Sequence, residues 1–240
     1  MLSKQVIIVT GASQGIGRSI AMACGREGAR VVVVARSEAQ TEAVATEIRF
    51  RGGAALAIPT DVTDEAQVNQ MVERTLEQFG RVDGLVNSAG VSPLASITDT
   101  SLAMWELTMA TNVTGTFLCC RAVWTPMSNQ HSGSILNISS GAGKQAHADW
   151  SAYCASKWAV MGLTESLSLE GFPLGIRVNA LCPGPTATAM RHSNFPDEDQ
   201  GTLMTPEDIA EAALFFFTDA ARYVRNAALD VRKRPRGWHS

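Results

Sequence analysis

Short apolar runs alternate along the chain with longer segments in which apolar residues recur at helical spacing. Most of these runs are continuously apolar and rich in valine and isoleucine, which is typical of parallel strands covered on both faces. The alternation predicts one α/β domain with a parallel sheet, without an internal repeat or a linker. Seven strands are expected, at residues 6–10, 29–35, 54–59, 82–87, 133–140, 175–181 and 227–231.

Three segments do not follow this alternation. Residues 101–127 predict one long helix with Asn112 in its middle, where asparagine has low helix propensity. The Asn112 amide would either face solvent or bend the helix around a water molecule. Residues 187–205 are polar and aperiodic, and we expect them to form a mobile substrate loop. Residues 232–240 form a basic C-terminal tail.

Composition and charge limit the classes of function. Hydrophobic residues make up 45% of the 240 residues and charged residues 18%, which argues against disorder. The formal net charge of -3 predicts no nucleic-acid partner, and the basic tail can be a solvated terminus. No apolar run approaches the roughly 18 residues of a membrane span, and no signal-peptide pattern is present, so we expect no membrane partner and a cytoplasmic location. The five cysteines lack metal-ligand spacing, so no metal site is expected.

A glycine cluster lies between the first strand and the first helix. Gly11, Gly15 and Gly17 let the chain turn tightly and let its backbone approach a pyrophosphate at the positive end of the helix. The alternative is an ordinary tight turn. After the second strand, where an acid would accept the ribose hydroxyls of NAD, the chain carries Arg36. An arginine can pair with a 2′-phosphate, so we expect NADP; NAD stays possible if Arg36 is only an exposed residue at a helix entry.

Tyr153 and Lys157 are four residues apart and share one face of a predicted helix. A phenol with its usual pKa of about 10 is a poor acid or base at neutral pH. A cation held beside the phenol favours the phenolate and lowers that pKa. The pair is therefore a candidate proton-transfer device.

These motifs, in this order, resemble those of the short-chain dehydrogenase/reductase family, including its 3-oxoacyl-carrier-protein reductase-like members. The glycine loop after Thr10, the stretch 87–90 and Pro183-Gly184 followed by Thr188 resemble the family's cofactor segments. The resemblance covers about residues 4–231. It implies a single Rossmann-like domain with a seven-stranded, doubly wound parallel sheet. It also implies reversible hydride transfer between NADP(H) and a carbonyl or secondary alcohol.

The resemblance assigns catalytic roles to four residues. Ser140 would hydrogen-bond the substrate oxygen, and Tyr153 would exchange a proton with it. Ser140 is chosen over Ser139 because the family's serine precedes the tyrosine by thirteen residues. Lys157 would lower the tyrosine pKa and bind the nicotinamide ribose, and Asn112 would hold a water that links Lys157 to solvent. The implied cofactor-binding residues are Gly11, Ser13, Gln14, Gly15, Ile16, Gly17, Arg36, Asp61, Val62, Asn87, Ala89, Gly90, Tyr153, Lys157, Pro183, Gly184, Thr186 and Thr188.

Two features depart from the family pattern. The segment 187–205 is shorter than in many members, which predicts a more open pocket. The last strand lacks the usual glycines and continues as Arg232-Lys233, so the expected homo-oligomer is either a tetramer or a dimer. The substrate stays open, and so do two alternatives: an NAD-dependent alcohol or sugar dehydrogenase, and a non-catalytic nucleotide-sensing protein. Candidate pocket residues are Pro93, His147, Trp150, Met190 and Phe195.

Overall fold

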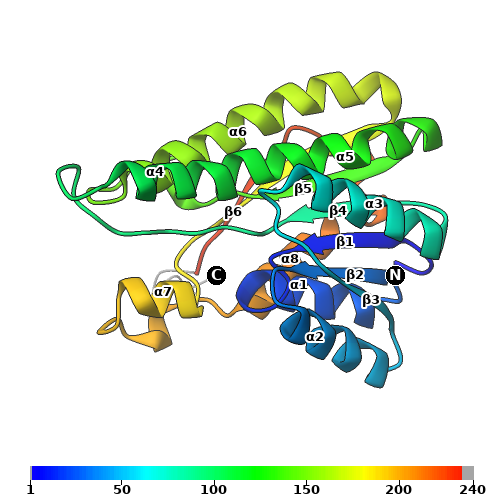
Figure 1. The fold of residues 1–240 in the computed structure, drawn as a ribbon, viewed down its shortest axis with the longest axis horizontal. Helices are drawn as coiled ribbons and strands as arrows, with labels where there is room; N and C mark the ends of the chain where they lie inside the picture. Colours follow the sequence, from blue (N-terminus) through cyan, green and yellow to red (C-terminus); the bar gives the residue numbers. More distant parts are fainter. Residues whose placement is uncertain (1, 234–240) are drawn as a thin grey trace, which may run out of the picture.

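A seven-stranded parallel sheet forms the centre of the computed structural model, which describes residues 2–233 (Figure 1). The strands lie in the order β3-β2-β1-β4-β5-β6-β7. The connections change direction between β1 and β4, which opens a crevice at the carboxyl ends of the strands. The predicted parallel α/β fold is therefore confirmed. The strands are β1 (Val6–Thr10), β2 (Arg30–Ala35), β3 (Ala54–Pro59), β4 (Gly84–Asn87), β5 (Gly133–Ile138), β6 (Ile176–Pro183) and β7 (Ala228–Val231).

Helices cover both faces of this sheet. Helices α1, α2 and α8 pack on one face, and α3, α4, α5 and α6 lie on the other (Figure 1). The bounds are α1 (Gly15–Arg26), α2 (Glu38–Phe50), α3 (Glu65–Phe79), α4 (Leu102–Met109), α5 (Gly115–Gln130), α6 (Ser151–Gly171), α7 (Ala189–Asn194) and α8 (Pro206–Phe215).

Strand β2 shows why the strands read as continuous apolar runs. Val31 and Val33 belong to the apolar cluster under α1, α2 and α8. Val32 and Val34 belong to the cluster under α3 and α5. Successive side chains of a strand point to opposite faces, so both sets must be apolar when helices cover both faces.

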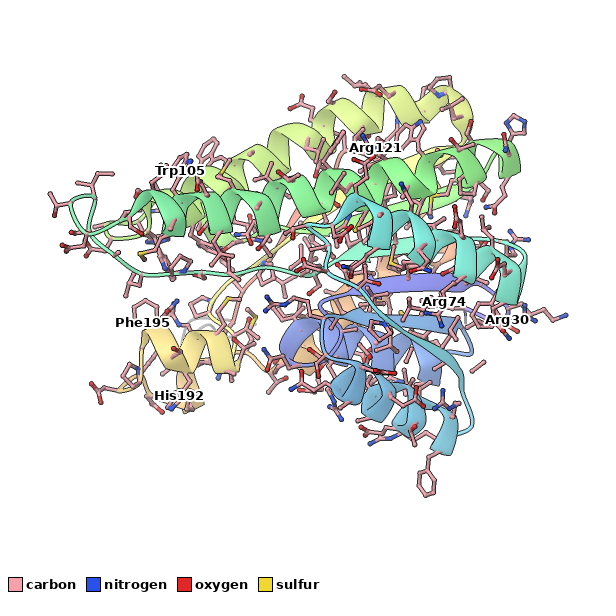
Figure 2. All side chains as sticks on the ribbon, in the orientation of Figure 1. Arg30, Arg74, Trp105, Arg121, His192 and Phe195 are labelled. Atoms are coloured by element: carbon pink, nitrogen blue, oxygen red, sulfur yellow. The ribbon has the colours of Figure 1, made fainter. Side chains whose placement is uncertain are left out.

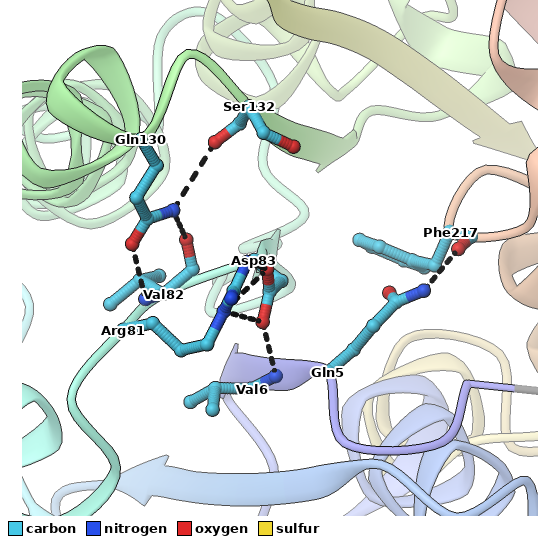
Figure 3. Close-up of polar contacts among 8 residues, drawn as sticks. All are labelled: Gln5, Val6, Arg81, Val82, Asp83, Gln130, Ser132 and Phe217. Atoms are coloured by element: carbon cyan, nitrogen blue, oxygen red, sulfur yellow. Dashed lines mark hydrogen bonds and ion pairs between the residues drawn. The ribbon is translucent and has the colours of Figure 1, made fainter.

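Polar side chains fasten the loops at the amino ends of the strands, away from the crevice (Figure 3). Asp83 accepts a 2.9 Å hydrogen bond from the backbone N–H of Val6 and pairs with Arg81 at 2.6 Å. Gln130 accepts a hydrogen bond from the Val82 N–H at 3.1 Å and donates one to the Val82 carbonyl at 2.7 Å. These side chains satisfy backbone groups that the ladder leaves free, so this edge has a structural role.

The long helix predicted at 101–127 is interrupted. Helix α4 ends at Met109, the residues Ala110–Thr114 form a π-helical turn, and α5 begins at Gly115. Asn112 is only 1% exposed within this turn, so the solvent-facing alternative is wrong. Single π-helical turns occur often at functional sites, because the wider turn redirects side chains.

The segment 187–205 also differs from the expectation of irregular structure. It contains α7 and a 3-10 turn at Gln200–Thr202. The Thr188 hydroxyl caps α7 by accepting a 3.1 Å hydrogen bond from the Arg191 N–H. Six residues are less than two helical turns, which is too short for apolar periodicity to be visible in the sequence.

The predicted basic tail falls mostly outside the described residues, which end at Lys233. The Lys233 ammonium group donates a 3.0 Å hydrogen bond to the Leu203 carbonyl, beside α8. None of the helices within residues 2–233 has both the length and the apolar character needed to cross a membrane. The same residues contain no cluster of three His, Cys, Asp or Glu side chains that could hold a metal ion.

Candidate active site

One large cleft of about 1070 Å³ lies at the carboxyl ends of β1, β4, β5 and β6, and α7 contributes to its wall. The cleft collects segments that are far apart in the sequence, because parallel strands present all their carboxyl ends at one edge. Every cofactor-binding and catalytic residue named from the sequence lines this cleft, except Asn87 and Asn112.

The glycine loop lies against the loop that follows β4. A Cβ atom on Gly11, whose φ is +64°, would lie 2.7 Å from the backbone nitrogen of Ala89. A Cβ atom on Gly17 would lie 2.3 Å from the carbonyl oxygen of Gly11. The Thr10 hydroxyl joins the two loops by accepting hydrogen bonds from the N–H groups of Ser88 (3.1 Å) and Ala89 (3.2 Å). Glycine is thus required for the close approach of two backbones, not only for turning.

The N-terminus of α1 opens into the same cleft. Its N-cap residue, Gln14, makes no side-chain hydrogen bond to the helix, and the first turn holds no acidic residue. The first N–H groups of a helix carry partial positive charge and need acceptors. The geometry therefore fits an anion such as a pyrophosphate.

Arg36, Asp61 and Val62 line the end of the cleft next to β2 and β3. Arg36 is exposed and makes no ion pair with any residue from 2 to 233. The Asp61 carboxylate accepts hydrogen bonds from the Thr63 N–H (3.0 Å) and hydroxyl (2.8 Å). The free guanidinium makes this end of the cleft receptive to a negative group.

Unlike the other cofactor-binding residues named from the sequence, Asn87 does not line the cleft. Its side chain is 4% exposed and donates a 2.9 Å hydrogen bond to the amide oxygen of Asn137. The two residues face each other in register on β4 and β5. Strand geometry turns the Asn87 side chain into the helical layer, where its amide nitrogen also lies 3.2 Å from the Cys120 sulfur of α5.

The two serines after β5 have different surroundings. Ser140 lines the cleft, and its hydroxyl accepts a 3.1 Å hydrogen bond from the Ala142 N–H. The Ser139 hydroxyl is buried and donates a 3.2 Å hydrogen bond to the backbone carbonyl of Lys157. Ser140 is therefore the serine placed where a ligand can reach it.

Tyr153 and Lys157 lie on the first two turns of α6 and both line the cleft. Burial raises the pKa of the Tyr153 phenol, and the Ser140 side chain and the charge of Arg191 partly offset this. Burial lowers the pKa of Lys157 from its usual 10.5 to about 8. Lys157 lies 5.6 Å from the centre of the tyrosine ring. Burial is the largest cause of both pKa shifts, because it disfavours the charged phenolate and the charged ammonium group alike.

Asn112 lies behind the cleft wall and clamps the loop after β4. Its amide oxygen accepts a 2.8 Å hydrogen bond from the Val91 N–H, and its amide nitrogen donates to the Val91 carbonyl at 2.9 Å and to Ser156 at 3.0 Å. The amide oxygen thus accepts one hydrogen bond and the amide nitrogen donates two, all with protein groups. Its contacts tie the π-helical turn to α6 and to the loop beside the cleft.

An aromatic wall forms the other end of the cleft. Trp150 packs at 5.4 Å from Tyr153, at 5.5 Å from Phe195 of the α7 segment and at 5.9 Å from His147, measured between ring centres. These aromatic residues and Met190 line the cleft as expected, whereas Pro93 does not. Sequence reasoning missed Arg191 and Asn194, which also line it. Both lie in the aperiodic segment, where only the structure assigns a direction to each side chain.

Comparison with known proteins agrees with this architecture. A family model described as short chain dehydrogenase matches residues 5–199. The chain is 36% identical to 2-(S)-hydroxypropyl-CoM dehydrogenase 3 of Xanthobacter autotrophicus, over 96% of each chain. It is also 36% identical to a 3-oxoacyl-[acyl-carrier-protein] reductase of Synechocystis, again over 96% of each chain.

A solved structure gives the same result for the fold. It is described as an NAD(P)-dependent gluconate 5-dehydrogenase from Beutenbergia cavernae with NADP bound at low occupancy. It superposes with a TM-score of 0.90 at 36% identity over 96% of each chain. The matched residues include the glycine loop and the Tyr153–Lys157 helix. The chain therefore belongs to the short-chain dehydrogenase family and is an oxidoreductase that acts on alcohol and carbonyl groups.

Proposed function

We propose that the protein interconverts a carbonyl compound and a secondary alcohol, with NADP(H) as the hydride carrier and Tyr153 as the general acid and base. The supporting observation is that one cleft contains the glycine loop, Ser140, Tyr153 and Lys157. The cofactor supplies the hydride; the chain supplies binding, orientation and proton transfer.

Each residue has a role that follows from its position. The Ser140 hydroxyl, whose side chain lowers the pKa of the phenol against the effect of burial, orients the substrate oxygen next to Tyr153. Tyr153 donates its proton to that oxygen during reduction and removes it during oxidation. The Lys157 ammonium group lies beside the tyrosine ring and favours the phenolate when oxidation generates it. Asn112 acts as a positioning residue, because its side chain binds Val91 and Ser156.

The preference for NADP rests on Arg36. An arginine without an acidic partner among residues 2–233 lines the end of the cleft that follows β2. The 2′-phosphate of NADP would provide Arg36 with a negatively charged partner, through a charge-assisted hydrogen bond. The NADP-bound relative from Beutenbergia cavernae supports the same choice.

The chain is also proposed to form a homo-oligomer. Large apolar side chains are exposed on the outer helices: Leu102 is 70% exposed, Trp158 53% and Leu169 65%. Exposed apolar side chains favour association between copies when they form a continuous patch. Sedimentation velocity is expected to give a mass above that of one chain, and a monomer at micromolar concentration would contradict this.

The test is a reductase assay with NADPH and, separately, NADH. Purified protein is mixed with a panel of ketones, oxo acids and their esters, and the loss of reduced-cofactor absorbance is followed. Turnover that requires the Tyr153 hydroxyl and is faster with NADPH supports the proposal. Cofactor binding without turnover of any carbonyl or alcohol would favour the non-catalytic alternative.

A further inference from the structure

Arg191 is a charged residue in the wall of the cleft that the hydride-transfer chemistry does not use. It lies in α7, and its side chain is 19% exposed. Its guanidinium carbon is 3.8 Å from the centre of the Phe195 ring and 6.0 Å from that of Trp150. This stacking on aromatic faces holds the plane of the guanidinium in one orientation.

Glu198 occupies one edge of this guanidinium. The Nε and Nη2 atoms of Arg191 donate to the two carboxylate oxygens of Glu198 at 2.6 and 2.7 Å. Arg191 lowers the pKa of Glu198, so the carboxylate stays ionised at neutral pH. A guanidinium has five N–H donors and a second bidentate edge, formed by Nη1 and the outer N–H of Nη2. No residue from 2 to 233 hydrogen-bonds Nη1.

Arg191 lies close enough to Tyr153 to act on the same substrate. Both lie beside Trp150, whose ring centre is 5.4 Å from that of Tyr153 and 6.0 Å from the guanidinium carbon of Arg191. The charge of Arg191 lowers the pKa of the phenol, against the effect of burial. A small substrate whose carbonyl meets Tyr153 can therefore present a second group to Arg191.

The wall that contains Arg191 combines apolar side chains with the polar side chains of His147 and Asn194. Its other charged residues are Asp149, which is exposed, and Arg232, which is loosely paired with Asp230 at 3.9 Å. An anionic group that enters such a wall loses hydration and needs a fixed, charged donor. Apolar side chains of this part of the wall are Leu94, Leu107, Trp150, Met190 and Phe195.

We propose that Arg191 is a specificity-determining residue that binds an anionic oxygen group, most simply a carboxylate, of the carbonyl substrate. The apolar part of the substrate rests on Trp150 and Phe195 while its carbonyl meets Ser140 and Tyr153. Glu198 orients Arg191 and also offsets part of its positive charge. The carboxylate of Glu198 therefore sets how strongly anionic substrates are preferred over neutral ones. This inference rests on the proposed carbonyl chemistry.

The test compares aryl and alkyl oxo acids of several lengths with their methyl esters. Wild-type enzyme is expected to have the higher kcat/KM for the acids. Arg191→Leu is expected to raise KM for the acids by about 10- to 100-fold, the range expected for a lost hydrogen bond to a charged group, with KM for the esters unchanged within about twofold. Glu198→Gln keeps a hydrogen-bonding group but removes the competing charge, so it is expected to lower KM for the acids.

A matched control is Arg121→Leu. Arg121 also pairs with a glutamate, Glu65 at 2.5 Å, and lies over an aromatic ring, Phe117 at 5.1 Å. It lies on α5, far from Phe195 in the view of Figure 2 and outside the cleft. This variant is expected to leave the ratio of acid to ester turnover unchanged.

Binding without turnover gives a second readout. Calorimetric titration of the protein–NADP complex with simple carboxylic acids and the corresponding amides is expected to show tighter binding of acids, lost in Arg191→Leu. Ester turnover without a preference for acids, or equal effects of Arg191→Leu on both, would overturn this inference alone. Absence of turnover with every acid and ester would count against the proposed function, and the calorimetric comparison would still decide the role of Arg191.

Discussion

The ammonium group of Lys157 donates a 2.8 Å hydrogen bond to the carbonyl oxygen of Ile138, the last residue of β5. The side chain is 6% exposed, and this carbonyl is its only hydrogen-bond partner among residues 2–233. A buried ammonium group with one neutral acceptor is poorly compensated for its lost hydration. The site thus holds Lys157 in place at a cost to the stability of the protein without ligand.

This cost predicts a pH dependence of stability. Burial lowers the pKa of Lys157 to about 8, below its usual 10.5, so between these values the unfolded chain binds more protons than the folded one. Stability contributed by this group therefore rises with pH across that interval. Relative to Lys157→Met, the wild-type free energy of unfolding is expected to increase by about 1 kcal/mol per pH unit above roughly pH 8. Urea denaturation of both proteins at several pH values measures this difference in the free energy of unfolding. Parallel pH profiles of the two proteins would contradict the prediction.

Replacing Tyr153 by phenylalanine separates catalysis from cofactor binding. The phenol is the proposed proton donor, so Tyr153→Phe is expected to lower kcat by at least about 100-fold. NADPH affinity, measured by fluorescence titration, is expected to change little, because the glycine loop and the α1 N-terminus are untouched. Retention of more than about a tenth of wild-type kcat would assign the proton transfer to another group.

Arg36 is predicted to determine cofactor choice. Arg36→Leu is expected to raise KM for NADPH by about 10- to 100-fold and to leave KM for NADH nearly unchanged, since only NADPH carries the 2′-phosphate. Arg51→Leu is the control, because Arg51 at the end of α2 pairs with Glu47 at 2.7 Å and does not line the cleft. A wild-type kcat/KM that is higher with NADH than with NADPH would refute the prediction.

Two glycines give opposite predictions for the same substitution. Gly17→Ala places a methyl group 2.3 Å from the Gly11 carbonyl oxygen, so the glycine loop must shift. We expect a loss of about 1–3 kcal/mol in stability, together with weaker NADPH binding. Gly162 lies in α6 with nothing within 4 Å of the added atom. Gly162→Ala is expected to gain about 0.5–1 kcal/mol from helix propensity. Thermal denaturation compares them, and equal shifts would contradict the role of the Gly11–Gly17 contact.

Much of the site can be predicted from the sequence, because the patterns that mark it involve residues close together along the chain. The residues after β1, β4, β5 and β6 can be located once the apolar strands are recognised, since parallel strands bring their carboxyl ends together. The glycine loop and the Tyr153–Lys157 spacing are short-range patterns of this kind. Strand existence, strand direction and most of the cleft were therefore predictable.

Three features depended on tertiary structure. Asn87 faces Asn137 instead of the cleft because the pleat and the register of β4 and β5 set its direction. Asn112 binds the Val91 backbone because the π-helical turn rotates it into the loop after β4. Arg191 meets Phe195 and Glu198 through a helix too short to leave a periodic signal.

The sequence by itself determined the sheet, its covering helices and the residues at its carboxyl edge, because these depend on apolar patterning and on spacing between neighbours. Tertiary structure decided the protonation preferences of Tyr153 and Lys157, which burial controls. It also decided which side chains reach the substrate end of the cleft. Both outcomes depend on segments that are distant in sequence, and their distances and dielectric surroundings exist only once the chain has folded.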